Sequence, residues 1–121
     1  MNIAIALGGK DLTSTVPDTF AAANYLLIID VDSKTVMEMI DGENLQDKSL
    51  VFAKKAAATD CEAIICGPIE KEPFLIIADE AMITRYNGVG MTGNDAVAAL
   101  EKDALPYIKD YIGGEGCVGH H

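Results

Sequence analysis

The stretch YLLIIDVDSKTVMEMID, residues 25–41, decides the fold because it holds two strand patterns joined by a short polar turn. Residues 25–32 form an apolar run rich in leucine and isoleucine, and DSK is typical of a tight turn. In residues 35–41 the polar Glu38 lies between apolar neighbours, which is the alternation of a half-buried strand. The stretch therefore predicts an antiparallel β-hairpin.

The residues around this hairpin predict three further strands and three helices. The apolar run NIAIAL (2–7) ends at a glycine pair and predicts a buried first strand. After the hairpin, helical and strand patterns alternate, and Pro73 falls in a first helical turn, where its missing N–H is tolerated. The expected elements are a helical turn at 19–24, helices at 48–59, 70–81 and 92–104, and strands at 61–67 and 82–88.

The order of these elements predicts the topology. Three strands linked by turns favour an antiparallel start, and the later strand–helix alternation requires right-handed crossovers that add parallel strands. We therefore expect an α/β fold of the ribonuclease H-like kind, with a mixed five-stranded sheet in a three-layer α/β/α arrangement. Strand 2–7 should lie in the centre of the sheet, between the hairpin and strand 61–66. Residues 1–104 should form one domain, followed by an irregular, glycine-rich tail at 105–121.

Composition excludes several classes of function. The chain has 121 residues, of which 19 are acidic and 9 basic, so its formal net charge is −10. Such a charge disfavours binding to nucleic acids or anionic membranes, and no basic stripe offsets it. No apolar run is long enough for a membrane span or a signal peptide, which predicts a soluble cytoplasmic protein. The three cysteines lack CxxC spacing and are expected to be free thiols or metal ligands.

The sequence GVGMTG (88–93) fits the pattern GxGxxG through Gly88, Gly90 and Gly93. Too few residues follow it to complete a dinucleotide-binding unit, so a glycine turn between a strand and a helix is the better interpretation. Thr92 has the spacing of a capping residue for that helix. Free N–H groups at such a helix start can bind an oxyanion or the polar edge of a metal cluster, and we expect weak binding there.

Enzymatic chemistry finds little support in the sequence. GGK (8–10) is not part of a P-loop, because Ala4 and Asp11 occupy positions that require glycine and serine or threonine. A nuclease of this fold would need an acidic residue within strand 2–7, which has none. Both histidines are terminal, and no nucleophile–base pair is recognisable. We therefore expect a protein that is not an enzyme.

The ending GGEGCVGHH (113–121) concentrates soft and borderline metal donors on a glycine-rich segment. Cys117, His120 and His121 are ligands that suit iron, copper, zinc or an iron–sulfur species. The terminal histidines also fit the remnant of a purification tag. Cys66, at the end of a strand, is a further candidate ligand from the body of the domain, although a buried, inert thiol is the more common role of such a cysteine.

Four segments in order resemble the dinitrogenase iron–molybdenum cofactor biosynthesis family: VPDTFAAANYLLIIDVD (16–32), AIICGPI (63–69), MITRYNGVG (82–90) and AVAAL (96–100). The resemblance covers residues 2–104 and implies a ribonuclease H-like fold. For the better-known members it implies non-catalytic binding of iron–sulfur or iron–molybdenum clusters. The family often has His-Phe-Gly where this chain has Thr19-Phe20-Ala21, so Phe20 is retained and a natural cluster ligand is missing. Some small relatives carry C-terminal Cys and His.

These observations favour a small carrier of an iron–sulfur or iron–molybdenum cluster, or of its precursor, without turnover. Its partners would be proteins that assemble or accept metal clusters. The alternative is a structural or regulatory interaction module of the same fold that binds no cofactor.

Overall fold

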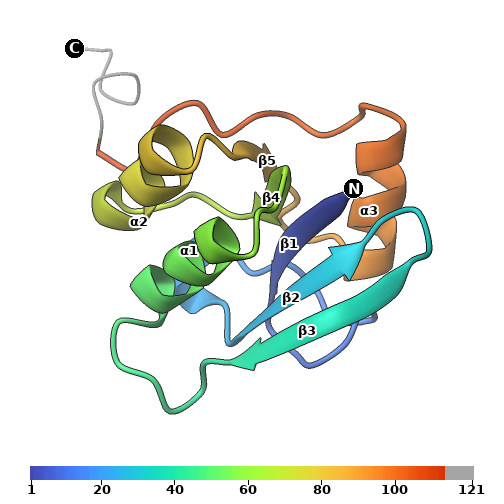
Figure 1. Ribbon diagram of the computed structural model, residues 1–121, viewed down its shortest axis with the longest axis horizontal. Helices are drawn as coiled ribbons and strands as arrows, with labels where there is room; N and C mark the ends of the chain where they lie inside the picture. Colours follow the sequence, from blue (N-terminus) through green and yellow to red (C-terminus); the bar gives the residue numbers. More distant parts are fainter. Residues whose placement is uncertain (114–121) are drawn as a thin grey trace.

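A computed structural model describes residues 1–113 and shows one five-stranded sheet with helices on both faces (Figure 1). The strand order is β3-β2-β1-β4-β5. The strands are β1 (Asn2–Leu7), β2 (Tyr25–Asp30), β3 (Thr35–Asp41), β4 (Ala63–Cys66) and β5 (Thr84–Asn87). The helices are the 3-10 turn η1 (Phe20–Ala22), α1 (Lys48–Ala58), α2 (Lys71–Leu75), the π-helical turn η2 (Ile76–Glu80) and α3 (Gly93–Glu101).

The pairing of β1 confirms the predicted topology. This central strand runs antiparallel to β2, with Ile3 opposite Ile29, and parallel to β4, with Ile3 opposite Ala63. β4 in turn runs parallel to β5. The sheet is therefore mixed, and the hairpin of β2 and β3 lies on the side of β1 away from β4. The narrower ribonuclease H-like assignment stays a prediction.

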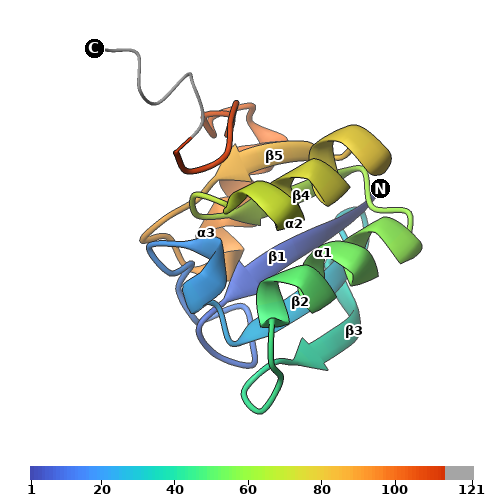
Figure 2. The same ribbon diagram turned by 90° about the vertical axis from the view of Figure 1, so that its left-hand side faces the viewer.

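Alternation along β1 explains the two helical layers. Ala4 and Ala6 face a cluster that contains Phe52 of α1 and Phe74 of α2, whereas Ile3, Ile5 and Leu7 face a second cluster with the apolar side of α3. Every residue from Ile3 to Leu7 is fully buried. Successive side chains of a strand point to opposite faces, so one apolar run supports both layers. Figure 2 shows α1 and α2 side by side on one face of the sheet.

Several element boundaries differ from the predicted ones. Residues 70–81 do not form one regular α-helix, because α2 ends at Leu75 and a π-helical turn follows. The last helix ends at Glu101 and not at 104, while its predicted cap is confirmed: the Thr92 hydroxyl accepts from the N–H of Asp95 at 3.1 Å.

β3 also departs from a regular half-buried strand. Its register against β2 shifts between Ile28 and Ile29, so that β3 contains an extra residue, Met37. Such a bulge bends a strand and interrupts the alternation of its side chains. Val36, Met37 and Met39 are exposed at 44%, 58% and 43%. The alternation around Glu38 therefore does not bury a complete apolar face.

Residues 105–112 are irregular in backbone, as the sequence predicts, yet they belong to the packed body. Leu105 and Ile108 are buried at 6% and 7% exposure, one in each core cluster. The N–H of Ile108 donates to the carbonyl of Arg85 on β5, and Tyr111 packs edge-on against Phe74. This segment runs along the outer side of β5 and covers that edge of the sheet.

Candidate functional site

Three loops meet at the carboxyl ends of the parallel strands β1, β4 and β5 (left in Figure 2). The N–H of Val16 donates to the carbonyl of Met91 at 2.8 Å, which joins the loop after β1 to the loop after β5. The N–H of Phe20 donates to the carbonyl of Pro68 at 2.9 Å, which joins the first loop to the loop after β4. In open α/β sheets, ligands bind outside the carboxyl ends of the strands. This edge is therefore the candidate functional site.

The glycines of the 88–93 loop are explained by packing. A Cβ on Gly88 would lie 2.7 Å from Cγ2 of Ile65, and one on Gly93 would lie 2.8 Å from Cδ2 of Leu12. Gly90 has φ +83°, a conformation that glycine adopts without strain. These requirements account for all three glycines without a ligand, in agreement with a glycine turn between β5 and α3.

The N–H groups of this loop are mostly used inside the protein. Gly90 donates to the carbonyl of Val16 at 3.0 Å, Gly93 to that of Ser14 at 2.9 Å, and Asn94 to that of Leu12 at 2.9 Å. The donors expected to meet an oxyanion therefore face residues 12–16. Binding of an oxyanion or cluster edge through Gly88, Gly90, Thr92 and Gly93 stays a prediction, and it requires that loop to move away.

Phe20 and Cys66 lie in the interior. Phe20 is fully buried and packs edge-on against Phe52, with ring centroids 6.3 Å apart. Cys66 is also fully buried, and this burial raises the pKa of its thiol, although the nearby Arg85 charge opposes the effect. Because metal ions bind the thiolate, burial argues against Cys66 as a ligand in this conformation. Its backbone carbonyl accepts from the N–H of Gly88 at 3.1 Å.

A cavity of about 390 Å³ opens where the loops after β4 and β5 meet the C-terminal segment. Tyr107 and Ile112 belong to its wall and remain 60% and 49% exposed. Its lining consists of Pro68, Asn87, Tyr107, Ile108, Lys109, Asp110 and Ile112. This wall was not predicted from the sequence because residues 105–121 were expected to form an irregular tail, although the apolar residues at 105, 108, 111 and 112 are a signal that the segment packs against the body.

The predicted tail ligands Cys117, His120 and His121 lie outside the described residues. The described chain ends at Gly113, next to the cavity residue Ile112, whose N–H donates to the carbonyl of Ile69 at 2.8 Å. Among residues 1–113, no group of three or more His, Cys, Asp or Glu side chains is placed to hold a metal ion. A metal site built on these donors therefore needs the residues beyond 113.

A second cavity, of about 350 Å³, lies at the first turns of α1 and α2. Ser49 and Glu70 belong to its wall, and Ser49 is only 8% exposed. Oε1 of Glu70 is buried and contacts no hydrogen-bond donor among residues 1–113. Three carboxylates, from Asp47, Glu70 and Glu72, line this cavity, which makes it less suited to an anionic ligand than the first one.

Comparison with known proteins identifies the family. The family described as "Dinitrogenase iron-molybdenum cofactor" matches residues 1–103. The chain belongs to this family. A search of the curated proteins found no match. Within the described residues no helix is long and apolar enough to cross a membrane.

Solved structures of similar proteins support the fold. The apo form of the orange protein from Desulfovibrio gigas superposes with a TM-score of 0.76 at 18% identity, over 90% of this chain and 93% of that chain. A candidate NifB protein from Thermotoga, assigned to the DUF35 family, gives a TM-score of 0.75 at 25% identity, over 91% and 95%. A candidate dinitrogenase from Methanocaldococcus jannaschii gives a TM-score of 0.63 at 19% identity, over 91% of this chain and 98% of that chain.

Proposed function

We propose that this protein is a non-catalytic cytoplasmic carrier of an iron–sulfur or iron–molybdenum cluster, or of a precursor of such a cluster. The observation that carries the proposal is the family match over residues 1–103. The cluster would be cargo, received from an assembly protein and passed to an acceptor protein. No catalytic residue is required for this role.

The position of the C-terminal segment supports a cargo site at the 390 Å³ cavity. Cys117 follows Gly113 by four residues, which span at most about 14 Å when extended. Cys117, and then His120 and His121, are therefore within reach of the cavity mouth. The cavity wall holds one positive charge, from Lys109, beside the negative charge of Asp110, in a chain whose net charge is −10. We propose these three tail residues as the ligands.

The alternative, an interaction module without cofactor, is favoured by one observation. The N–H groups of Gly90, Gly93 and Asn94 are already bonded to residues 12–16. A protein that binds no cofactor at this loop would keep that arrangement permanently. The two functions therefore differ in whether the chain takes up metal at all.

Anaerobic reconstitution with iron and sulfide, or with molybdate, tests the proposal. We expect visible absorption from a bound cluster in the full chain and none after removal of residues 115–121. The melting temperature should be nearly unchanged by the truncation, because the last buried apolar residue among residues 1–113 is Ile108. Affinity should fall as the pH drops through the histidine range near 6.5, since protonated imidazole and thiol do not bind metal.

Cys117→Ser and Cys61→Ser form a matched pair for this experiment. Cys61 lies at the opposite end of β4 from the cavity and is 6% exposed, so its substitution should leave metal uptake unchanged. Uptake that survives both Cys117→Ser and the truncation would exclude the tail as the site. Absence of uptake by the full chain under every condition would favour the interaction module.

A further inference from the structure

β3 forms an edge of the sheet that is open for pairing. Within residues 1–113 its only strand neighbour is β2, and no isolated bridge reaches its outer side. Its large apolar side chains Val36, Met37 and Met39 are each more than 40% exposed. An uncovered edge that carries apolar side chains is a template for another strand.

The hydrogen bonds of β2 determine which backbone groups of β3 face outward. The N–H of Val31 donates to the carbonyl of Met1, and the N–H of Gly42 donates to that of Asn24. Because bonded positions alternate along an antiparallel strand, Leu27 and Ile29 bond toward β1. Met39 and Val36 lie opposite these two residues in β3. Their N–H and C=O groups therefore point to the open side of the strand. If β3 lacked the extra residue Met37, the N–H and C=O groups of Val36 would point in the opposite direction from those of Met39.

One antiparallel register satisfies these outward groups with a second copy of the same strand. If Val36 of one copy lies opposite Met39 of the other, a two-fold axis passes between Met37 and Glu38, and both outward pairs exchange hydrogen bonds. Val36 and Met39 lie on one face of the sheet, since both are opposite residues of the same core cluster. The pairing therefore also brings apolar side chains into contact.

Charge supports this register. Two residues further from the axis, Lys34, which lies in the turn before β3, comes near Asp41 of the other copy, and the two-fold axis repeats the pair. Lys34 Nζ now contacts Oε1 of Glu101 at 2.7 Å, with side chains 62% and 43% exposed, a surface pair that gives little stability and can be exchanged. Among residues 1–113, Asp41 Oδ1 accepts only the N–H of the nearby Glu43, at 2.9 Å. Glu38 is compensated by Lys55 of its own chain at 2.7 Å.

We propose that two copies of this chain associate through antiparallel pairing of β3 with β3, which joins the two sheets into one. The interface is isologous, as in most two-fold dimers. The opposite edge and its cavity stay free in each copy, so the dimer would carry two cargo sites at its far ends. The net charge of −10 on each copy opposes association, so the dimer should become tighter as moderate salt screens the long-range repulsion.

Cysteine cross-linking tests the register. In a Cys117→Ser background, Val36→Cys protein is mixed with Met39→Cys protein under mild oxidation. The mixture should form a covalent dimer containing one chain of each kind, several-fold faster than either protein alone. The native Cys61 and Cys66 are buried and should not interfere. Equal or faster cross-linking of Met39→Cys with itself would overturn the proposed register.

Sedimentation velocity from micromolar to millimolar concentration tests the association itself. Met39→Lys should raise the dimer dissociation constant by about tenfold or more, because the two-fold axis places the change in the interface twice. Met82→Lys is the matched control: Met82 is 83% exposed, lies outside β3 and should leave the constant unchanged. Circular dichroism verifies that both variants are folded. A full chain that stays monomeric over the whole range, or equal effects of the two variants, would overturn the proposal.

Discussion

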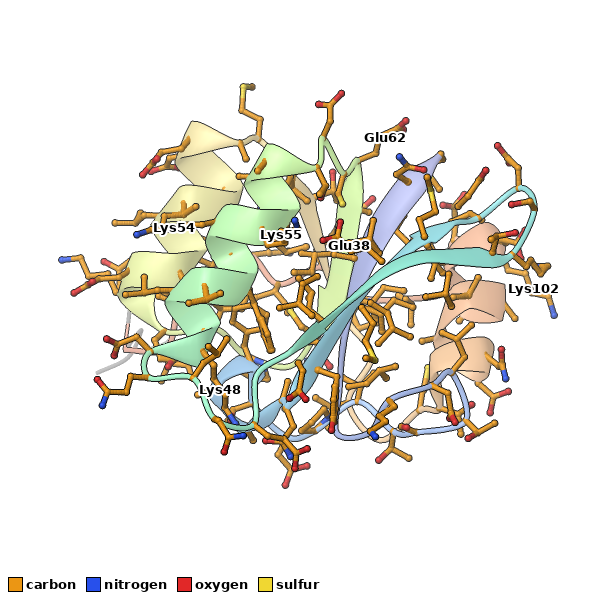
Figure 3. The ribbon with its side chains drawn as sticks, turned by 60° about the horizontal axis from the view of Figure 1, so that its bottom comes forward. Glu38, Lys48, Lys54, Lys55, Glu62 and Lys102 are labelled. Atoms are coloured by element: carbon orange, nitrogen blue, oxygen red, sulfur yellow. The ribbon has the colours of Figure 1, made fainter. Side chains whose placement is uncertain are left out.

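The two edge strands of the sheet, β5 and β3, differ in whether a further backbone segment pairs with them. At β5, residues 105–112 supply the missing partner: Asn87 donates to the carbonyl of Pro106 at 2.8 Å and Ile108 to that of Arg85 at 2.9 Å. At β3, the described residues supply no backbone partner on the side away from β2, and side chains such as Glu38 connect the strand to a helix (Figure 3).

This difference separates the roles of the two sides. The covered edge buries Ile108 and forms the wall of the larger of the two cavities described above. The open edge contributes little to the core, since most β3 residues are exposed, and no other strand within residues 1–113 pairs with its outer side. In our proposals the covered side holds the cargo and the open side contacts another chain. Substitutions at the covered edge should therefore lower the free energy of unfolding more than substitutions at the open edge.

The largest effect is expected from Ile108→Ala. Ile108 is 7% exposed and belongs to the cluster under α2, so its truncation should lower the free energy of unfolding by about 2–4 kcal/mol. Met39→Ala on the open edge should cost less than about 0.5 kcal/mol. Urea unfolding, at a concentration where the chain is monomeric, measures both. Equal losses would contradict the contrast between the edges.

The second-largest loss of stability is expected from Arg85→Ala. The guanidinium donates to the carbonyls of Ile83 and Ile108, at 2.7 and 3.1 Å, and lies 4.9 Å from the ring centre of Phe74. Losing these contacts should destabilise the protein by about 1–3 kcal/mol.

Hydrogen exchange locates the effect of this substitution. The amides of Asn87 and Ile108 should exchange faster in Arg85→Ala than in the parent protein, because the covering segment is released from β5. Lys102→Ala, at an exposed position after α3 (Figure 3), is the control and should change neither quantity. Unchanged exchange at Ile108 would mean that Arg85 does not hold the segment.

A pH effect is expected at the start of the hairpin. The hydroxyl of Tyr25 donates to the Glu43 carboxylate, and this hydrogen bond, with burial, raises the pKa of Tyr25 to about 12. An unfolded tyrosine ionises near pH 10. The stabilisation is therefore complete below pH 10 and is lost as the pH rises toward 12. Melting temperatures from pH 9 upward should fall more steeply for the parent than for Tyr25→Phe; parallel curves would contradict the assignment.

The smallest effect should come from Glu38→Gln. The Glu38–Lys55 pair is 2.7 Å long, but both side chains are more than a third exposed. Because solvent screens such a pair, it contributes only about 0–0.5 kcal/mol to the free energy of unfolding. Glu62→Gln, also exposed, gives the background for losing one carboxylate. A loss above 1 kcal/mol, relative to this background, would show that the pair anchors β3 to α1.

The sequence was sufficient for the strand order because local signals define the elements, and the order of these elements with right-handed crossovers limits how the strands can be arranged. The apolar run of β1, the turn between β2 and β3 and the cap at Thr92 each act within a few residues. The π-helical turn and the bulge at Met37 depend on how those elements pack against the sheet, which no local pattern states.

The site was less predictable for the same reason. Gly90 and Gly93 were correctly placed in a turn before a helix, but their N–H groups meet Val16 and Ser14, which are distant in sequence. Cys66 ends a strand as expected, but its complete burial depends on the helices that pack on the two faces of the sheet. The cavity wall at Tyr107 and Lys109 depends on a segment without regular structure.

The central position of β1 has a mechanical consequence. The strand is bonded on both sides, so a pull on its amino end against the carboxyl edge loads the β1–β2 and β1–β4 bonds together in shear. A pull from residue 113 instead loads one irregular segment, whose bonds to β5 can break one at a time. Forced unfolding is governed by the rate of crossing its barrier. We therefore expect an unfolding motor to meet strong resistance at the N-terminus and to unravel the protein readily from the other end.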